Sequence, residues 1–131
     1  MTARAAQHAF AYYCLALGAW IVLSPASLFS TITVATGGFL SASDVRPELL
    51  ATQYGALCGF FYMYLGVLYI GMSGNDAFNR FSVKSRCFGV TGLLLSLVVL
   101  GKVPAKLFVF ALIDVAFALW TQSALPEGKQ A

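Results

Sequence analysis

Four long apolar runs, separated by short polar segments, dominate the chain. They predict helices at about residues 9–29, 49–73, 82–101 and 107–125. About 20 apolar residues are enough for a helix to cross the hydrocarbon core of a membrane. We therefore expect an all-α fold, a bundle of four transmembrane helices with antiparallel neighbours, forming a single membrane domain over residues 1–131.

The first predicted helix contains a proline, and the third apolar run is short for a membrane span. Pro25 follows Ser24 inside the first run and should bend or end that helix, because proline removes a backbone donor. An apolar run at an N-terminus is also compatible with a secretory signal peptide. Aromatic residues flank this run and it continues past the proline, so we expect a retained first transmembrane helix. The third run is short, so we expect residues 82–86 to extend it.

The composition makes lipid the main solvent of the chain. Hydrophobic residues make up 60% and charged residues 10%, against about 45–50% and about 25% in a soluble domain. The net charge of +3 is spread over the connections, which does not favour nucleic acid. The expected partners are the lipid bilayer and other membrane proteins or further copies of the chain. A hydrophobic small molecule is a further candidate.

Basic residues predict the orientation of the chain. Cytoplasmic connections carry an excess of Lys and Arg. The side that holds both termini should carry Arg4, Arg80, Lys84, Arg86 and Lys129, and the opposite side Arg46, Lys102 and Lys106. Both termini are therefore expected to face the cytoplasm, or the matrix or stroma of an organelle.

Asp114 is an ionisable residue near the middle of the fourth predicted helix. A carboxylate at that depth costs about 2.5–3.5 kcal/mol on insertion scales. Ala111 and Ala118 share its helix face and leave room for another helix. No Lys or Arg is expected at this depth, so we expect a neutral Asp114 that donates a hydrogen bond and locks its helix to the others; contact with a ligand or substrate is the alternative. The candidate partners are the tyrosine hydroxyls of the second helix, Ser24, Thr91 and Ser96.

Small residues and tyrosines mark the second and third helices. Small side chains at helical spacing let another helix backbone approach closely. The predicted packing residues are Ala51, Gly55, Gly59, Gly66, Gly89, Gly92 and Ser96. The candidate ligand-binding residues are Asp114, Tyr54, Tyr62 and Tyr69, which together would suit a polar head group or a quinone-like ring. Interface anchoring and interhelical hydrogen bonding are the alternative role of the tyrosines.

Motifs of catalysis are missing from the sequence. There is no second apolar-run carboxylate to pair with Asp114 for acid–base chemistry, and no glycine-rich phosphate loop. His8 is the only histidine, and the three cysteines form no CxxC pair, so we expect neither a metal nor a cofactor. An enzyme that acts on a hydrophobic substrate through a single acid remains an alternative, and Asp114 would be its candidate catalytic residue.

Two stretches resemble a known group of membrane proteins. They run from Leu17-Gly18 through Leu23-Ser24-Pro25, and from Ile113-Asp114-Val115 through Ala118-Leu119-Trp120-Thr121. Both are similar to small, largely uncharacterised four-helix proteins of the DoxX-like kind. The resemblance implies the four-helix fold and a link to membrane redox and quinone-associated complexes, and it carries over no catalytic residue. The long loop after the first run and the tyrosine-rich second helix depart from that pattern.

The sequence is compatible with three functions. The leading hypothesis is a non-catalytic accessory or scaffold subunit that packs against other membrane proteins. The alternative is a binder or processing enzyme of a quinone, sterol or other isoprenoid that uses the buried acid. An oligomeric transporter is a third hypothesis, since four short helices rarely enclose a pore alone.

Overall fold

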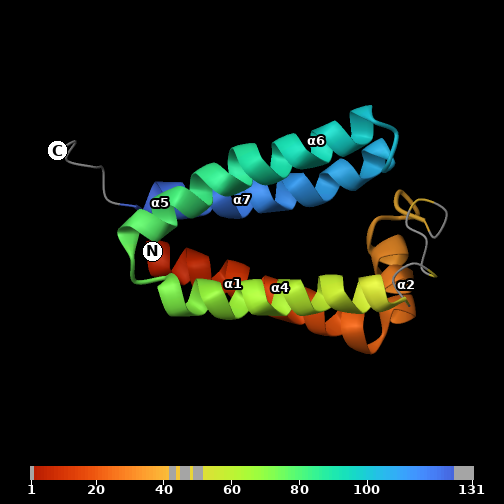
Figure 1. The fold of residues 1–131 in the computed structure, drawn as a ribbon, viewed down its shortest axis with the longest axis horizontal. Coiled ribbons are helices and arrows are strands. Elements are labelled where there is room, and N and C mark those ends of the chain that lie inside the picture. The colour runs from red at the N-terminus through yellow and green to blue at the C-terminus, as the bar shows by residue number, and fades with distance from the viewer. Residues whose placement is uncertain (1, 42–43, 45–47, 49–51, 126–131) are drawn as a thin grey trace. The chain divides into compact units, whose positions relative to one another are not determined.

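The described part of the chain is helical. The computed structural model describes residues 2–41, 44, 48 and 52–125, and these residues form helices and no strand (Figure 1). The expected all-α class is therefore confirmed. Four helices are long and apolar enough to cross a membrane: Ala3–Leu23, Gln53–Met72, Asp76–Val99 and Ala105–Ala124. The chain is thus a small membrane protein.

Apart from the stretch between α2 and α4, few residues separate consecutive helices. They are α1 (Ala3–Leu23), α2 (Pro25–Ala35), α4 (Gln53–Met72), α5 (Asp76–Lys84), the π-helix η1 (Ser85–Val90), α6 (Thr91–Val99), the 3₁₀ turn η2 (Ala105–Leu107) and α7 (Phe108–Ala124). Because α5, η1 and α6 are consecutive, they form one membrane-length segment.

The first predicted helix is divided at its proline. The structure ends α1 at Leu23 and begins α2 at Pro25, a first-turn position that costs no backbone hydrogen bond. Trp20 Nε1 donates to Ser27 Oγ over 2.7 Å, which ties the two helices together. The first helix also begins at Ala3, so the polar residues before residue 9 are already helical.

The third membrane-length helix begins earlier than the sequence predicted. The sequence predicted this helix from about residue 82, whereas the structure starts α5 at Asp76. Asn75 caps this helix, because its side chain accepts a hydrogen bond of 3.1 Å from the Phe78 backbone N–H. Residues 76–81 therefore belong to the helix and not to a connection.

The chain divides into two compact units. One comprises Met1–Phe10 and Leu68–Ala131, and the other comprises Ala11–Val67. The expectation that they form a single membrane domain stays a prediction.

In the Ala11–Val67 unit, glycines bring α1 and α4 into close contact. A methyl group added at Gly18 would lie 2.5 Å from the carbonyl oxygen of Gly59, and one at Gly66 would lie 2.8 Å from that of Ala11. Early residues of α1 thus meet late residues of α4, which is the order of an antiparallel pair. Gly55 is buried as well, and Ala51 lies outside the described residues.

In the other unit, α5 and α7 pack with the start of α1. Ala3, Val83, Ala118 and Leu125 form an apolar cluster there. Ala118 is fully buried and Ala111 nearly so, as the small-residue face of the fourth predicted helix requires. Polar side chains lie beside this cluster and define the candidate site.

Candidate functional site

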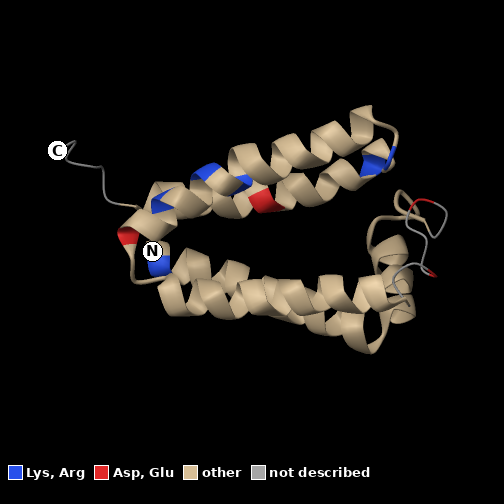
Figure 2. Cartoon of the chain, in the orientation of Figure 1, with Lys and Arg blue, Asp and Glu red and all other residues tan. Residues whose placement is uncertain are grey.

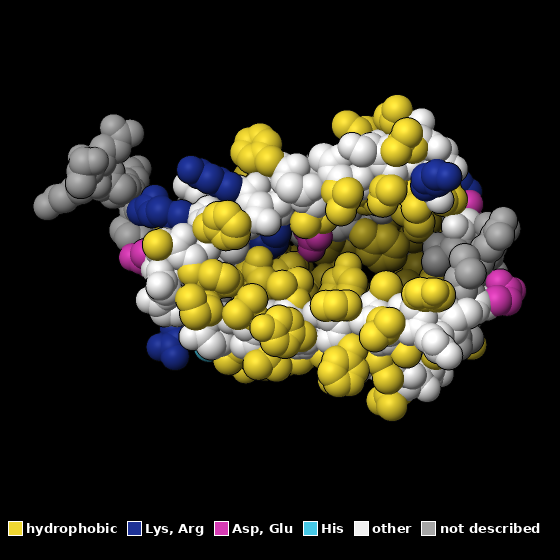
Figure 3. All heavy atoms as spheres, in the orientation of Figure 1, with side chains coloured by type: hydrophobic (Ala, Val, Ile, Leu, Met, Phe, Trp, Pro, Cys, Tyr) yellow, Lys and Arg dark blue, Asp and Glu magenta, His cyan; other side chains and the backbone are white. Residues whose placement is uncertain are grey.

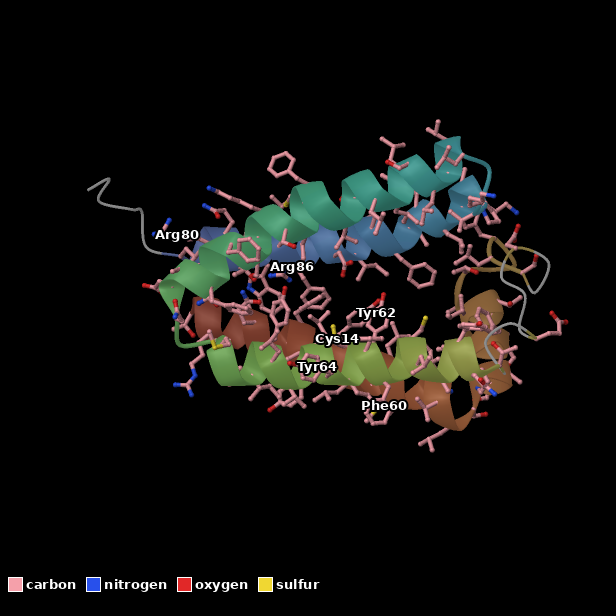
Figure 4. The ribbon with its side chains drawn as sticks, viewed as in Figure 1. Cys14, Phe60, Tyr62, Tyr64, Arg80 and Arg86 are labelled. Carbon is pink, nitrogen blue, oxygen red and sulfur yellow. The ribbon has the colours of Figure 1, made fainter. Side chains whose placement is uncertain are left out.

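Arg86 is the centre of a buried polar cluster. It lies in η1, and only 2% of its surface is exposed. Its Nη2 group donates to Gln7 Oε1 at 3.1 Å, to Ser82 Oγ at 3.2 Å and to Thr121 Oγ1 at 3.3 Å. Figure 4 shows Arg86 turned in among the helices, whereas Arg80 points away from them. One guanidinium therefore connects α1, α5 and α7.

The acceptors of Arg86 are themselves hydrogen-bonded. Gln7 Nε2 donates to Ser82 Oγ over 2.7 Å, and Ser82 Oγ donates to the Asn79 carbonyl over 3.1 Å. Thr121 Oγ1 donates to the Phe117 carbonyl over 2.9 Å. Buried polar groups are costly unless they are paired. This network thus satisfies groups that apolar surroundings would otherwise penalise.

Aromatic rings lie against the guanidinium. The Arg86 Cζ atom lies 4.3 Å from the ring centroid of Phe10 and 5.4 Å from that of Tyr69. The two rings meet edge to face at 5.0 Å. A cation over an aromatic face is attracted by the ring quadrupole. Tyr69, predicted to bind a ligand, thus lies beside Arg86 at the end of α4.

Asp114 lies on α7 within electrostatic reach of Arg86, and it is half-buried. α7 carries no other acidic residue (Figure 2). The expectation that no Lys or Arg lies at the depth of Asp114 is therefore wrong. The reason is the start of α5 at Asp76, which places Arg86 well inside the membrane-length segment rather than near its end. A nearby cation offsets only part of the cost of a buried carboxylate, so a neutral Asp114 stays a prediction.

The hydroxyls proposed as partners of Asp114 bond elsewhere. Thr91 Oγ1 donates to the Arg86 carbonyl over 3.3 Å, and Ser96 Oγ donates to the Gly92 carbonyl over 2.8 Å. Both hydroxyl groups therefore donate their protons to backbone carbonyls of their own membrane-length segment. Ser24 belongs to the Ala11–Val67 unit.

The four candidate ligand residues are divided between the units. Asp114 and Tyr69 lie around Arg86, whereas Tyr54 and Tyr62 belong to the Ala11–Val67 unit. The side chain of Tyr54 is 79% exposed. Their convergence on one ligand stays a prediction.

Two apolar grooves lie on α4 in that second unit. One has a volume of about 320 Å³ and is lined by Leu57, Phe60, Phe61 and Tyr64. The other, of about 250 Å³, is lined by Phe61, Tyr62, Tyr64 and Leu65. Figure 4 shows Phe60 and Tyr62 on opposite sides of α4. These linings carry hydroxyl groups but no charge.

The small residues of α6 and η1 form an open face. Gly89, Gly92 and Ser96 are exposed. A methyl group added at Gly92 would meet no described atom within 4 Å, and one at Gly89 would meet only Ser85 Oγ, at 3.6 Å, among the described residues. We call these three residues the open small-residue face. It contrasts with Gly59 and Gly66, whose space α1 already fills.

Several residues of the buried cluster were missed by the sequence-based predictions. They are Gln7, Asn79 and Ser82, together with the buried position of Arg86. Asn79, Ser82 and Arg86 follow one another at steps of three and four, which places them on one helix face. That spacing was the available signal, and it was missed because the helix was predicted to start only at about residue 82.

The described residues contain no group of three or more His, Cys, Asp or Glu that could hold a metal ion. No protein-family model, curated protein or solved structure matches the chain. Its resemblance to the DoxX-like group stays a prediction.

Proposed function

We propose that the chain is a non-catalytic accessory subunit that packs against another membrane protein through the open small-residue face. The observation that carries this proposal is the difference between its two sets of small residues. The space beside Gly59 and Gly66 is occupied by atoms of α1, whereas no described atom lies within 4 Å of a methyl group added at Gly92. A second helix approaching Gly92 would find its backbone accessible.

The surroundings of this face support the same role. In lipid, helices associate through close packing rather than through hydrophobic burial, and small residues permit that approach. No residue of α6 is buried in the described structure. Phe88 and Leu93, which are 79% and 65% exposed, flank the small residues and offer large side chains for a partner to pack against.

The Arg86 cluster supports a structural rather than a catalytic use of Asp114. Arg86 contacts side chains of α1, α5 and α7 and a tyrosine of α4. A cluster that joins so many helices would give the outer face of α6 a rigid support.

The mass of the assembly extracted in mild detergent tests this function. We expect the parent chain to migrate with a larger assembly, and Gly92→Leu to release it because a leucine would fill the open face. Gly71→Leu is the matched control, since Gly71 also has no described atom within 4 Å of an added methyl group. It should leave the assembly intact.

Two results would reject the accessory role. One is a parent chain that migrates only as a monomer without a co-purifying protein. The other is an assembly that survives Gly92→Leu, provided that the variant retains its helical circular dichroism.

We further propose that both termini face the cytoplasm, or the matrix or stroma. Burial of Arg86 removes it from the connections, so four basic residues remain on the terminal side against three opposite. A cysteine introduced at Thr2 should be protected from an impermeant thiol reagent in intact cells, and one introduced at Val103 should react. The reverse labelling would contradict this orientation.

A further inference from the structure

Basic side chains gather at one end of the unit that contains α5 and α7. Arg4 and Lys84 are exposed, and Arg80 is half-buried. Their neighbours Ala3 and Val83 belong to one apolar cluster, which places Arg4 and Lys84 at the same level of the unit. Figure 2 shows basic positions at the start of α1 and along α5. We call Arg4, Arg80 and Lys84 the basic collar.

Helix α5 presents two different sides. It buries Asn79, Ser82 and Val83. Its other side carries Phe81, which is 68% exposed, and the exposed Lys84. Figure 3 shows hydrophobic side chains along the visible lengths of the helices and basic side chains mainly near their ends. An exposed aromatic ring next to cations suits the boundary between acyl chains and head groups.

We propose that the basic collar, with Phe81, binds the head groups of anionic phospholipids. Phosphates of the lipid would meet Arg4 and Lys84, while the Phe81 ring would enter the acyl region. Asp76, one turn before Arg80, is the acidic residue among residues 2–10 and 74–86. The three cations of the collar and Asp76 together carry a net charge of +2, and Arg86, the fourth cation of these ranges, is buried. This surface is separate from the open small-residue face, and the proposal does not depend on the accessory role.

The opposite end of the same unit offers a matched comparison. Lys102 and Lys106 lie in and just after the connection between α6 and η2. They are exposed and equal in number to the two exposed cations of the collar. Val103 and Pro104 lie between them, and the nearby Phe108 is half-buried, whereas Phe81 is exposed. Removing these two charges changes the net charge of the chain as much as removing Arg4 and Lys84.

Quenching of Trp120 by brominated lipids tests the proposal. Trp120 lies on α7 between Ala118 and Leu125, which belong to the apolar cluster at the level of the collar. The chain has two tryptophans, so the experiment uses Trp20→Phe as the parent. It is reconstituted in phosphatidylcholine vesicles that contain a small fraction of brominated phosphatidylglycerol or, in parallel, of brominated phosphatidylcholine.

We expect the anionic lipid to be preferred at Trp120 about fivefold or more, since each basic residue near the surface contributes roughly this factor. The double variant Arg4→Gln, Lys84→Gln should bring the preference close to one. The double variant Lys102→Gln, Lys106→Gln should keep it, and Asp76→Asn should raise it. High salt should weaken the parent's preference by screening.

Equal quenching by the two lipids in the parent would overturn the proposal. So would a preference that survives the collar substitutions, or one that the Lys102 and Lys106 substitutions reduce equally. The substituted side chains are exposed, and helical circular dichroism of each variant verifies that the fold is retained.

Discussion

The guanidinium carbon of Arg86 lies 4.3 Å from the ring centroid of Phe10. This contact joins η1 to α1 inside a segment that is long and apolar enough to cross a membrane. The ring covers the guanidinium, and Gln7, Ser82 and Thr121 accept hydrogen bonds from Nη2. The cost of burying this charge is thus offset by partners from several helices. We therefore expect Arg86 to be a main stabilising residue of its unit.

Replacing Arg86 should lower the free energy of unfolding of the protein. Arg86→Ala removes the hydrogen bonds to three side chains and leaves Asp114 without its nearby cation. Leaving buried polar groups without their hydrogen-bond partner costs about 1–3 kcal/mol. The free energy of unfolding, measured by titrating mixed micelles with a denaturing detergent, should fall by that amount.

Arg80→Ala is the control for this experiment. Arg80 lies on α5, the helix that leads into η1, but it is only half-buried. We expect it to cost less than about 1 kcal/mol, as exposed or rim charges do. Equal effects of the two substitutions on the free energy of unfolding would show that Arg86 is not a main stabilising residue of the unit.

Asp114 and Arg86 should be energetically coupled. Asp114→Asn keeps the size of the side chain but removes its negative charge, so Arg86 loses a favourable interaction. In an Arg86→Gln background the same substitution should matter much less. A double-mutant cycle on the free energy of unfolding should give a coupling of about 0.5–3 kcal/mol. Strictly additive effects would mean that the two charges do not support each other.

Gly18 should tolerate no side chain. A methyl group there would lie 2.5 Å from the Gly59 carbonyl oxygen and 2.8 Å from the Met63 backbone nitrogen. Backbone atoms yield only by moving a helix, so Gly18→Ala should destabilise the protein by about 1–3 kcal/mol. The midpoint of thermal unfolding in detergent measures this effect.

Gly71→Ala provides the opposite expectation. An added methyl group at Gly71 meets no described atom within 4 Å. Alanine stabilises a helix by roughly 0.5–1 kcal/mol relative to glycine, so this variant should unfold at the same temperature as the parent or higher. A loss of stability as large as that of Gly18→Ala would contradict the close α1–α4 contact.

The apolar pattern alone predicted the helical class and the membrane-length helices. Apolar runs report burial in lipid directly, since each needs about 20 residues to cross. The bounds were less accurate where polar residues belong to a helix. Residues 76–81 looked like part of a connection because their charges hide an amphipathic period, and the capping role of Asn75 was missed.

The buried cluster could not be predicted because its members come from separate segments. Gln7 and Thr121 lie near opposite ends of the chain, and both contact Arg86. A sequence shows the cost of Asp114 but not the identity of the cation beside it. Likewise, the small residues of two helices look alike in the sequence. Only the structure separates Gly59, which α1 covers, from Gly92, which is open.

The most direct test of the accessory role is photo-crosslinking in intact membranes. A photoreactive residue is placed at Gly92 and, as the control, at Leu112, an exposed position on α7. We predict that the residue at position 92 forms a discrete adduct with one membrane protein, while the residue at position 112 forms that adduct weakly or not at all. Labelling of lipid alone from position 92, or equal protein adducts from both positions, would contradict the proposed docking of a partner on the open small-residue face.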